Sequence, residues 1–158
     1  MLAVTKPIMV EIRILGRGDD HLLDRVAFDV FDHPIIARSA REFLSDPRHH
    51  LAVGIEAGVV VGMVSAVHYL HPDQQEAELW INQVGVGADH RQRGIGTALI
   101  QRLLDLGREL GCTKSWVLTD DDNQAAKLLY ARCGGVPAVR PAIMYEFDLK
   151  PQDADPPT

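Results

Sequence analysis

Hydrophobic residues follow two different periods along this chain, and each period predicts its own kind of element. Val10, Ile12 and Ile14 alternate with polar residues, a spacing typical of a half-buried strand. Apolar segments bounded by turn residues predict further strands at 50–56, 59–70, 78–86, 114–119 and 142–149. The Glu-Ala-Gly sequence at 56–58 predicts a hairpin turn between the second and third of these strands.

Other segments carry apolar residues at three- and four-residue steps, which is the period of an amphipathic helix. They predict helices within 20–27, 35–44, 95–110 and 124–133. Gly111 is placed to end the third helix, and Asn123 to cap the fourth. Strand 78–86, helix 95–110 and strand 114–119 form a crossover unit, so the two strands should run parallel. We therefore predict one α/β (α+β) domain over residues 1–150, followed by a disordered polar tail at 151–158.

Composition and charge narrow the class of partner. The 158 residues are 46% hydrophobic and 24% charged, as in an ordinary globular protein, and the net charge is -6. An acidic balance argues against binding to nucleic acid and favours a cationic partner. Two cysteines are too few for a disulfide framework, and the most apolar run, 59–67, is interrupted by Gly62 and Ser65. We expect a cytoplasmic protein that makes no contact with a membrane.

The turn before helix 95–110 is a candidate anion site. It reads Arg91-Gln92-Arg93-Gly94-Ile95-Gly96 and opens directly into the helix. Backbone N–H groups in a first helical turn lack internal partners, and the helix dipole makes that end positive. No GxxxxGK[ST] string occurs, and the dinucleotide pattern fails at Leu99. A pyrophosphate is the ligand that this turn favours, and an ordinary capped helix with solvated arginines is the alternative.

A second motif lies downstream of this turn. Asn123, Ala126, Leu129, Tyr130 and Gly134 match the pattern NxxAxxLYxxxG, and the first turn matches [QR]xxGx[GA] after a strand. Together the two motifs resemble those of the GNAT superfamily of N-acetyltransferases, although Gly-Val replaces the usual Gly-Phe ending. The resemblance implies acetyl-CoA as co-substrate. It also implies a mixed sheet of six to seven strands flanked by about four helices, with the central parallel strands splayed.

The same resemblance assigns residues to the cofactor. These residues lie at the end of strand 78–86, in the turn, and in the second motif. They are Val84, Val86, Arg91, Gln92, Arg93, Gly94, Ile95, Gly96, Thr97, Asn123, Ala126 and Tyr130.

Acetyl transfer to an amine also needs an oxyanion donor, a proton for the departing thiolate, and a base. The resemblance makes Tyr130 the candidate general acid and a backbone N–H near Val84 the oxyanion donor; a tyrosine packed at the core edge is the alternative. Glu78 and Asp148 are the candidate bases, with His68 next. Burial of Glu78 beside Trp80 would raise its pKa toward the useful range, whereas a solvated Glu78 would leave the proton to a water relay.

Two other chemistries find no support in the residues. The histidines lack matching ligand spacing and HExxH is absent, so we expect no metal site. GxSxG is also absent, which leaves serine-based hydrolysis unsupported.

Within the superfamily, the chain resembles the aminoglycoside 3-N-acetyltransferases of the gentamicin-modifying type over loop 28–34, segment 64–86, loop 89–100, segment 128–134 and the ending 144–149. This resemblance implies a small cationic amine as acceptor and a homodimer. Gln83 stands where those enzymes tend to carry an aspartate, so a polyamine, another small amine or a protein amine remains open, as does a non-catalytic acyl-CoA sensor. The candidate acceptor contacts are acidic side chains, with His33 beside them: Asp29, Asp32, Asp121, Asp122 and Asp148.

Overall fold

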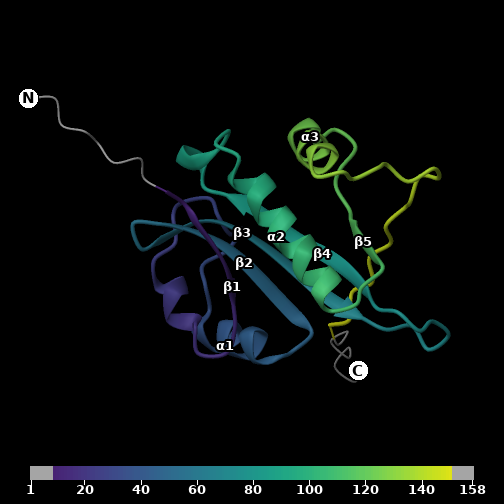
Figure 1. Cartoon of the computed structure of the whole chain (residues 1–158), viewed down its shortest axis with the longest axis horizontal. Coiled ribbons are helices and arrows are strands. Elements are labelled where there is room, and N and C mark those ends of the chain that lie inside the picture. Colours follow the sequence, from purple (N-terminus) through teal and green to yellow (C-terminus); the bar gives the residue numbers. More distant parts are fainter. Residues whose placement is uncertain (1–8, 151–158) are drawn as a thin grey trace, which may run out of the picture.

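A single five-stranded sheet forms the centre of the protein, for which a computed structural model describes residues 9–150 (Figure 1). The strands lie side by side in chain order, with the first four antiparallel to their neighbours and the last two parallel. They are β1 (Glu11–Leu15), β2 (His49–Glu56), β3 (Val59–Tyr69), β4 (Glu78–Val86) and β5 (Lys114–Val117).

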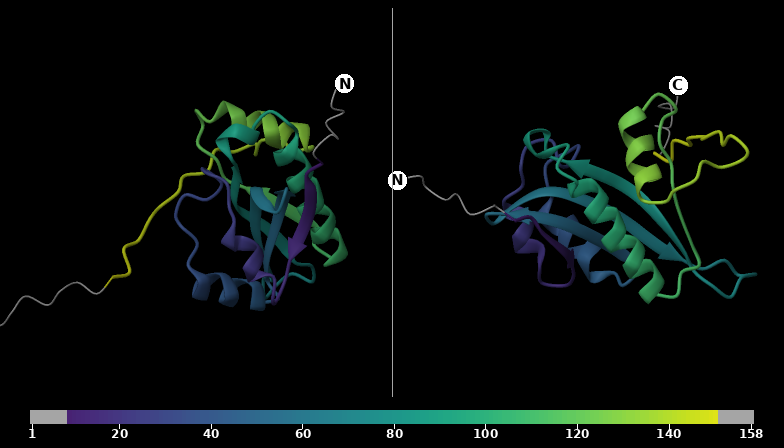
Figure 2. Two further views of the ribbon diagram at one scale, coloured as in Figure 1. Left: turned by 90° about the vertical axis from the view of Figure 1, so that its left-hand side faces the viewer. Right: turned by 45° about the horizontal axis from the view of Figure 1, so that its top comes forward.

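Helices cover the two faces of the sheet unequally. The longest helix, α2 (Ile95–Glu109), crosses one face, and the short η1 (Asp20–Asp24) and α1 (Ala37–Ser45) lie on the other (Figure 2). Under α2, Leu99 and Leu103 pack on Ala52, Val64 and Ile81 in a continuous apolar cluster. Leu23 and Leu44 pack on β2 and β3 in a second cluster on the opposite face. The remaining elements are η2 (Ala88–His90) and α3 (Gln124–Arg132), and α3 contacts the first turn of α2.

The predicted parallel crossover is confirmed, but several predicted elements are wrong. The described residues form five strands and three α-helices, not six to seven and about four. Segment 20–27 holds only the 3-10 turn η1, because Arg25 is extended and Ala27 N donates to Val60 O of β3 at 2.8 Å. Residues 142–149 are not a strand. Their alternation is present, but no neighbouring strand in the described part of the chain supplies hydrogen bonds.

Two further predictions concern the end of the chain and the membrane. The predicted tail at 151–158 lies outside the described residues. Among the helices that are described, none combines the length and the apolar character needed to cross a membrane.

Candidate active site

The parallel strands β4 and β5 separate where β4 approaches α2. Their pairing runs from Glu78 opposite Lys114 to Ile81 opposite Val117 and then stops, whereas β4 continues to Val86. Asn82 is an extra residue against β3, because Ser65 faces Gln83 while Ala66 faces Ile81. Within the described residues, the β5 side of the chain at Val84–Val86 therefore has no strand partner. This free backbone edge can pair with an extended, amide-containing ligand.

The turn before α2 presents an uncapped helix end. Gly94 is the N-cap residue, at φ 78°, and no side chain caps the first turn of α2 or places an acidic group in it. Gln92 also lies in the left-handed region, at φ 60°. A Cβ on Gly94 would meet open space, so the glycine serves the backbone conformation and not close packing. The unpaired N–H groups and the positive helix end suit a phosphate.

Both arginines of this turn are held by protein groups. Arg91 Nε donates to Val86 O at 3.1 Å, and the Arg91 guanidinium pairs with Asp29. Arg93 donates to both carboxylate oxygens of Glu56, at 3.2 and 2.7 Å, and this contact holds the pKa of Glu56 below its usual range. The arginines thus fix the shape of the turn, and its backbone N–H groups are left for an anion. Sequence reasoning missed Glu56, which it placed in a hairpin turn.

The predicted acceptor loop lies against the end of β4. A Cβ on Gly85 would stand 1.9 Å from Val30 O, so the loop backbone occupies the space of a side chain at that position. Asp29 has φ 66° and pairs with Arg91, and Asp32 Oδ2 accepts a hydrogen bond from Gln83 Nε2 at 3.1 Å. Both predicted aspartates therefore lie beside the point where β4 and β5 separate. The signal for this contact was a glycine inside a strand, which often marks close backbone approach.

Helix α3 brings Tyr130 to the same region. A Cβ on Gly96 would lie 3.3 Å from Leu129, so Gly96 lets α3 approach α2. The Asn123 side chain accepts from Ala126 N at 3.1 Å and caps α3, which gives both residues a structural role. Tyr130, like Val84 and Val86, packs against the apolar cluster under α2, and burial raises the pKa of its hydroxyl. A hydroxyl that stays protonated at neutral pH is suited to donate a proton.

Glu78 lies at the opposite end of β4, six residues and about 20 Å from Val84. Its carboxylate accepts from Tyr69 Oη at 3.0 Å and lies 4.0 Å from Lys114 Nζ. These partners, the Tyr69 hydrogen bond first, lower the pKa of Glu78, so the predicted rise is wrong. His68, the next candidate, contacts buried His50 with 2.7 Å between ring nitrogens. Neither residue is brought to the separating strands.

Three other candidate carboxylates do not lie with Asp29 and Asp32 beside the end of β4. Asp121 is exposed and pairs with Lys127 at 2.5 Å, and its neighbour Asp122 is also exposed. Asp148 is exposed in the segment after α3 and accepts only from Lys150 N, at 3.0 Å. Their predicted contact with an acceptor stays a prediction.

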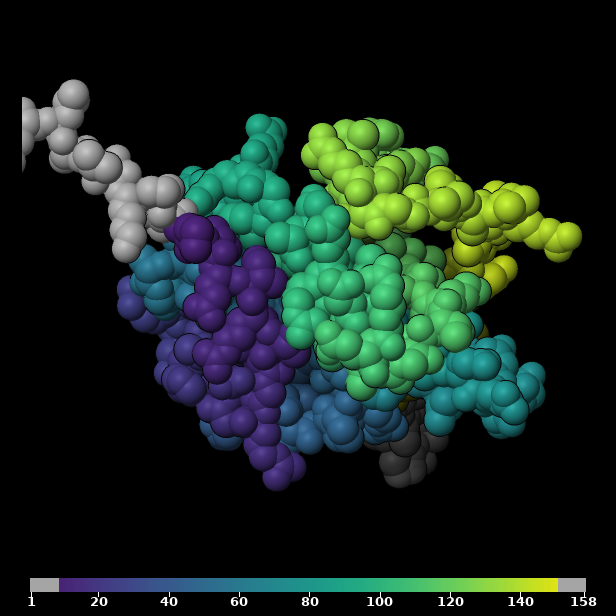
Figure 3. All heavy atoms as spheres, viewed as in Figure 1, coloured from purple at the N-terminus to yellow at the C-terminus, as the bar shows by residue number. Residues whose placement is uncertain are grey.

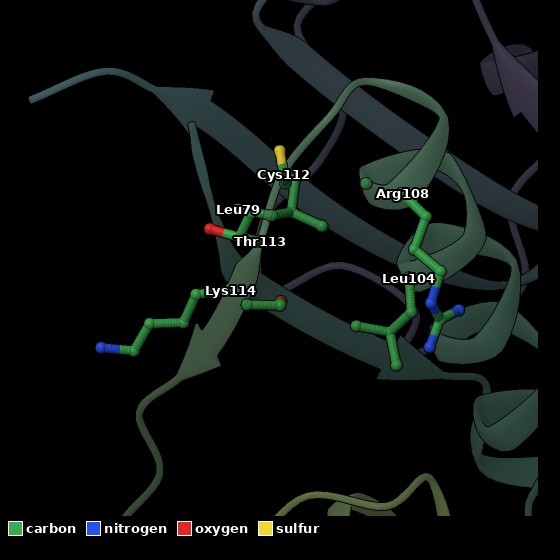
Figure 4. Close-up of a pocket in the computed structure, with 8 residues that line it drawn as sticks. Leu79, Leu104, Arg108, Cys112, Thr113 and Lys114 are labelled. Carbon is green, nitrogen blue, oxygen red and sulfur yellow. The ribbon is translucent and has the colours of Figure 1, made fainter. Parts of the chain in front are cut away.

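A hollow of about 130 Å³ lies at the other end of α2 (Figure 4). It is lined by Leu79, Leu104, Arg108, Cys112 and Lys114, among others. Ligand sites usually enclose roughly 300–1,000 Å³, so this hollow is too small for a coenzyme. The turn at Gly94 remains the candidate cofactor site.

Comparisons with known proteins agree with this geometry. Residues 20–135 match the family described as "Acetyltransferase (GNAT) family". N-acetyltransferase 8 of Rattus norvegicus is 29% identical over 102 residues, which cover 65% of this chain and 46% of that protein. L-2,4-diaminobutyric acid acetyltransferase of Nocardia farcinica is 38% identical over 74 residues, 47% of this chain and 37% of that protein. The chain thus spans less than half the length of the curated relatives it matches.

Solved structures share the fold. The aminoglycoside acetyltransferase meta-AAC0020, from an uncultured soil metagenomic sample, superimposes with a TM-score of 0.77 at 18% identity and covers 89% of this chain and 97% of its own. Aminoglycoside N-acetyltransferase AAC(6')-Iy in complex with CoA gives 0.72 at 19% identity, with 91% and 98% covered. The family match spans the turn before α2, the separating strands and α3, and the chain therefore belongs to the GNAT family of acetyltransferases, whose co-substrate is acetyl-CoA.

Proposed function

We propose that this chain transfers the acetyl group of acetyl-CoA to a primary amine of a small polycation, and that an aminoglycoside, acetylated at its 3-amino group, is the first candidate acceptor. The observation that carries the proposal is the position of Asp29 and Asp32, two carboxylates held at the end of β4 beside the uncapped start of α2. Asp29 is paired with Arg91, so the exposed Asp32 carboxylate is the group that can attract a polycation and orient one of its amines. The aminoglycoside acetyltransferases with this fold support the choice of acceptor.

The donor has a natural path through the site. N–H groups at the start of α2 bind its diphosphate, and the free edge of β4 at Val84 and Val86 pairs with the amides of its pantetheine arm. This path leads the thioester to the region where β4 and β5 separate.

Each residue then has a role in the transfer. Asp32, held by Gln83, orients the acceptor amine, which attacks in its neutral form. A backbone N–H near Val84 donates to the oxyanion of the tetrahedral intermediate. When the C–S bond breaks, Tyr130 Oη donates its proton to the thiolate, and solvent takes the proton that the amine nitrogen loses.

A panel of amines assayed with a thiol-detecting dye tests the acceptor class. It contains aminoglycosides with and without a 3-amino group, linear polyamines and a lysine peptide. The proposal expects release of CoA with aminoglycosides, and loss of that signal when the 3-amino group is absent. Release with polyamines or the peptide alone would overturn the aminoglycoside assignment and leave the transferase assignment in place.

A smaller diamine is the second candidate. Gln83 stands where the aminoglycoside acetyltransferases that this chain resembles tend to carry an aspartate, and a neutral side chain there leaves fewer negative charges for a large polycation. The similarity to L-2,4-diaminobutyric acid acetyltransferase favours the same choice. Diaminobutyric acid therefore belongs in the panel. Binding of acetyl-CoA without turnover on any member would instead favour a non-catalytic sensor.

Replacing Asp32 with Asn separates acceptor binding from donor binding. An asparagine still accepts from Gln83 but loses the charge, so the KM for the amine should rise about tenfold while the KM for acetyl-CoA stays unchanged. Asp105→Asn, an exposed carboxylate on α2, is the matched control and should change neither constant. An unchanged amine KM in Asp32→Asn would remove this carboxylate from the acceptor site.

A further inference from the structure

The carboxylate of Glu56 joins the β2–β3 hairpin to the segment before α2. Arg93 donates to both of its oxygens, and His90 Nε2 lies 3.2 Å from Glu56 Oε2. The Glu56 side chain is only 12% exposed, whereas that of Arg93 is 39% exposed. A carboxylate that is mostly buried needs such partners, so the contact links the two segments firmly.

The hairpin is a rigid support for this carboxylate. Glu56 is the last residue of β2 and pairs with Val59 of β3 across the turn. Ala57 and Gly58 both have positive φ, 50° and 74°, as in the tight two-residue turns that match the twist of a hairpin. The position of Glu56 is therefore fixed by the sheet.

The turn before α2 has little main-chain support of its own. In the described part of the chain, none of the N–H groups of Gln92, Arg93 and Gly94 donates to a main-chain oxygen. The turn lies at the surface of the molecule, at the end where β1 begins (Figure 3). Side chains must therefore hold these N–H groups in an arrangement that suits a phosphate.

One ring nitrogen of His90 is buried without a partner. This atom, Nδ1, has no hydrogen-bond partner among the described residues, and a Cβ on Gly87 would lie 3.3 Å from it. A proton on Nδ1 would lack an acceptor, so the neutral ring carries its proton on Nε2 and donates it to Glu56. Glu56 thus accepts from His90 and Arg93 at once, which requires both oxygens of a carboxylate.

We propose that Glu56 is a positioning residue for the coenzyme, and that Arg93 acts on the diphosphate through Glu56 and not by direct contact. The two contacts hold the chain on both sides of Arg91 and Gln92, so the N–H groups at the start of α2 are arranged before the coenzyme binds. The proposal rests on binding of the diphosphate at the start of α2, and it is independent of the acceptor amine.

Calorimetric titration with CoA tests the positioning role. Glu56→Gln should weaken CoA binding about tenfold, because its amide presents N–H groups where Arg93 and His90 also donate. The Kd of pantetheine, which has no diphosphate, should stay as in the wild type in an NMR titration. Asp46→Asn is the matched control, since Arg48 donates to both oxygens of Asp46 just before β2, and it should bind CoA normally. Unchanged CoA binding in Glu56→Gln, or an equal loss for both ligands, would overturn the proposal.

A double variant separates an indirect role of Arg93 from a direct one. Arg93→Gln alone should weaken CoA binding about tenfold, since it leaves the Glu56 carboxylate without its main partner. In the Glu56→Gln background, Arg93→Gln should cause no further loss, because its only route to the coenzyme is already broken. A further loss of CoA affinity in the double variant would mean that Arg93 contacts the phosphates, and would overturn the proposal.

Gly94→Val distinguishes failure of this proposal from failure of the site. If Gly94→Val weakens CoA binding and Glu56→Gln does not, the diphosphate site stands and the positioning role is wrong. If neither variant weakens CoA binding, the diphosphate binds elsewhere and both proposals are wrong.

Discussion

Polar residues lie at both ends of β4, but their hydrogen-bonding surroundings differ. At its start, Tyr69 donates to Glu78 at 3.0 Å and accepts from Trp116 Nε1 at 2.9 Å, which closes a network of protein groups. At its end, the first turn of α2 has no capping side chain. There, Asp29 and Gln92 also adopt positive φ, a conformation that non-glycine residues rarely take. Chemistry is expected at the end where polar groups remain available to a ligand.

The histidines strengthen this contrast. The His50 side chain is only 7% exposed, lies on the face of the sheet that α2 covers, and contacts His68. Burial lowers the pKa of His50 to about 4. A perturbed pKa is often taken as the sign of a functional site. Here it belongs to a partly buried histidine pair away from the turn before α2. Because His50 is buried and paired with His68, and no open site lies beside it in the described part of the chain, the pair has a structural role.

The largest expected effect comes from Gly85→Ala, which tests the end of β4. The new methyl group would collide with Val30 O, so the free energy of unfolding should fall by about 3 kcal/mol and acetyl transfer should be lost. Urea denaturation and the thiol assay measure the two effects. Gly16→Ala is the control, since its Cβ meets nothing within 4 Å. Normal stability in Gly85→Ala would mean that loop 28–34 does not rest on β4.

Tyr130→Phe should lower kcat by about 100-fold, because the thiolate would lose its proton donor. The KM for acetyl-CoA should stay unchanged, since the ring still packs against the apolar cluster under α2. Tyr69→Phe makes the same chemical change at the other end of the sheet and should leave kcat unaltered. Equal kcat values in wild type and Tyr130→Phe would remove this hydroxyl from the mechanism.

Gly94→Val should weaken acetyl-CoA binding about tenfold, because a left-handed backbone costs a side chain roughly 1–2 kcal/mol and the N–H groups would shift. Calorimetric titration with CoA measures the loss. Gly111→Val is closely matched, since Gly111 also has φ 78° and open space around its Cβ but lies at the far end of α2. If both variants bound CoA equally well, the diphosphate would have to bind elsewhere.

The smallest effect is expected for Glu78→Gln, which should not change turnover. In the folded chain the pKa of Glu78 is lowered, so its charge stabilises the fold at neutral pH, and this contribution is lost as pH falls through the folded pKa. The variant should therefore lose less thermal stability between neutral and acidic pH than the wild type does. A large drop in kcat would restore Glu78 as the base.

The sequence predicted the local elements around the candidate site well. Helices α2 and α3, their glycine ends and the parallel crossover follow from short-range patterns and from the family resemblance, whereas the roles of the aspartates in loop 28–34 stay predictions. Contacts between distant residues did not follow from them. Asp32 and Gln83 are 51 residues apart, and Glu56 and Arg93 are 37 apart, so strand register and loop packing decide both contacts.

Two errors have physical causes of the same kind. The lowered pKa of Glu78 depends on Tyr69 of β3 and then on Lys114 of β5, which its own alternation pattern does not contain. The alternation at 142–149 predicts a strand that does not form, because a strand exists only when a neighbour supplies hydrogen bonds.

The contact between Val30 O and Gly85 has a consequence for how the acceptor range of this protein can change. Since the main chain of the loop rests directly on the strand, insertions or a larger residue at position 85 would displace loop 28–34 from the end of β4. On the proposed acceptor site, exchange of the side chains that the loop presents, such as those at positions 29, 32 and 33, is therefore the expected route to a different acceptor. New acceptors should arise there by point substitution and without remodelling of the backbone.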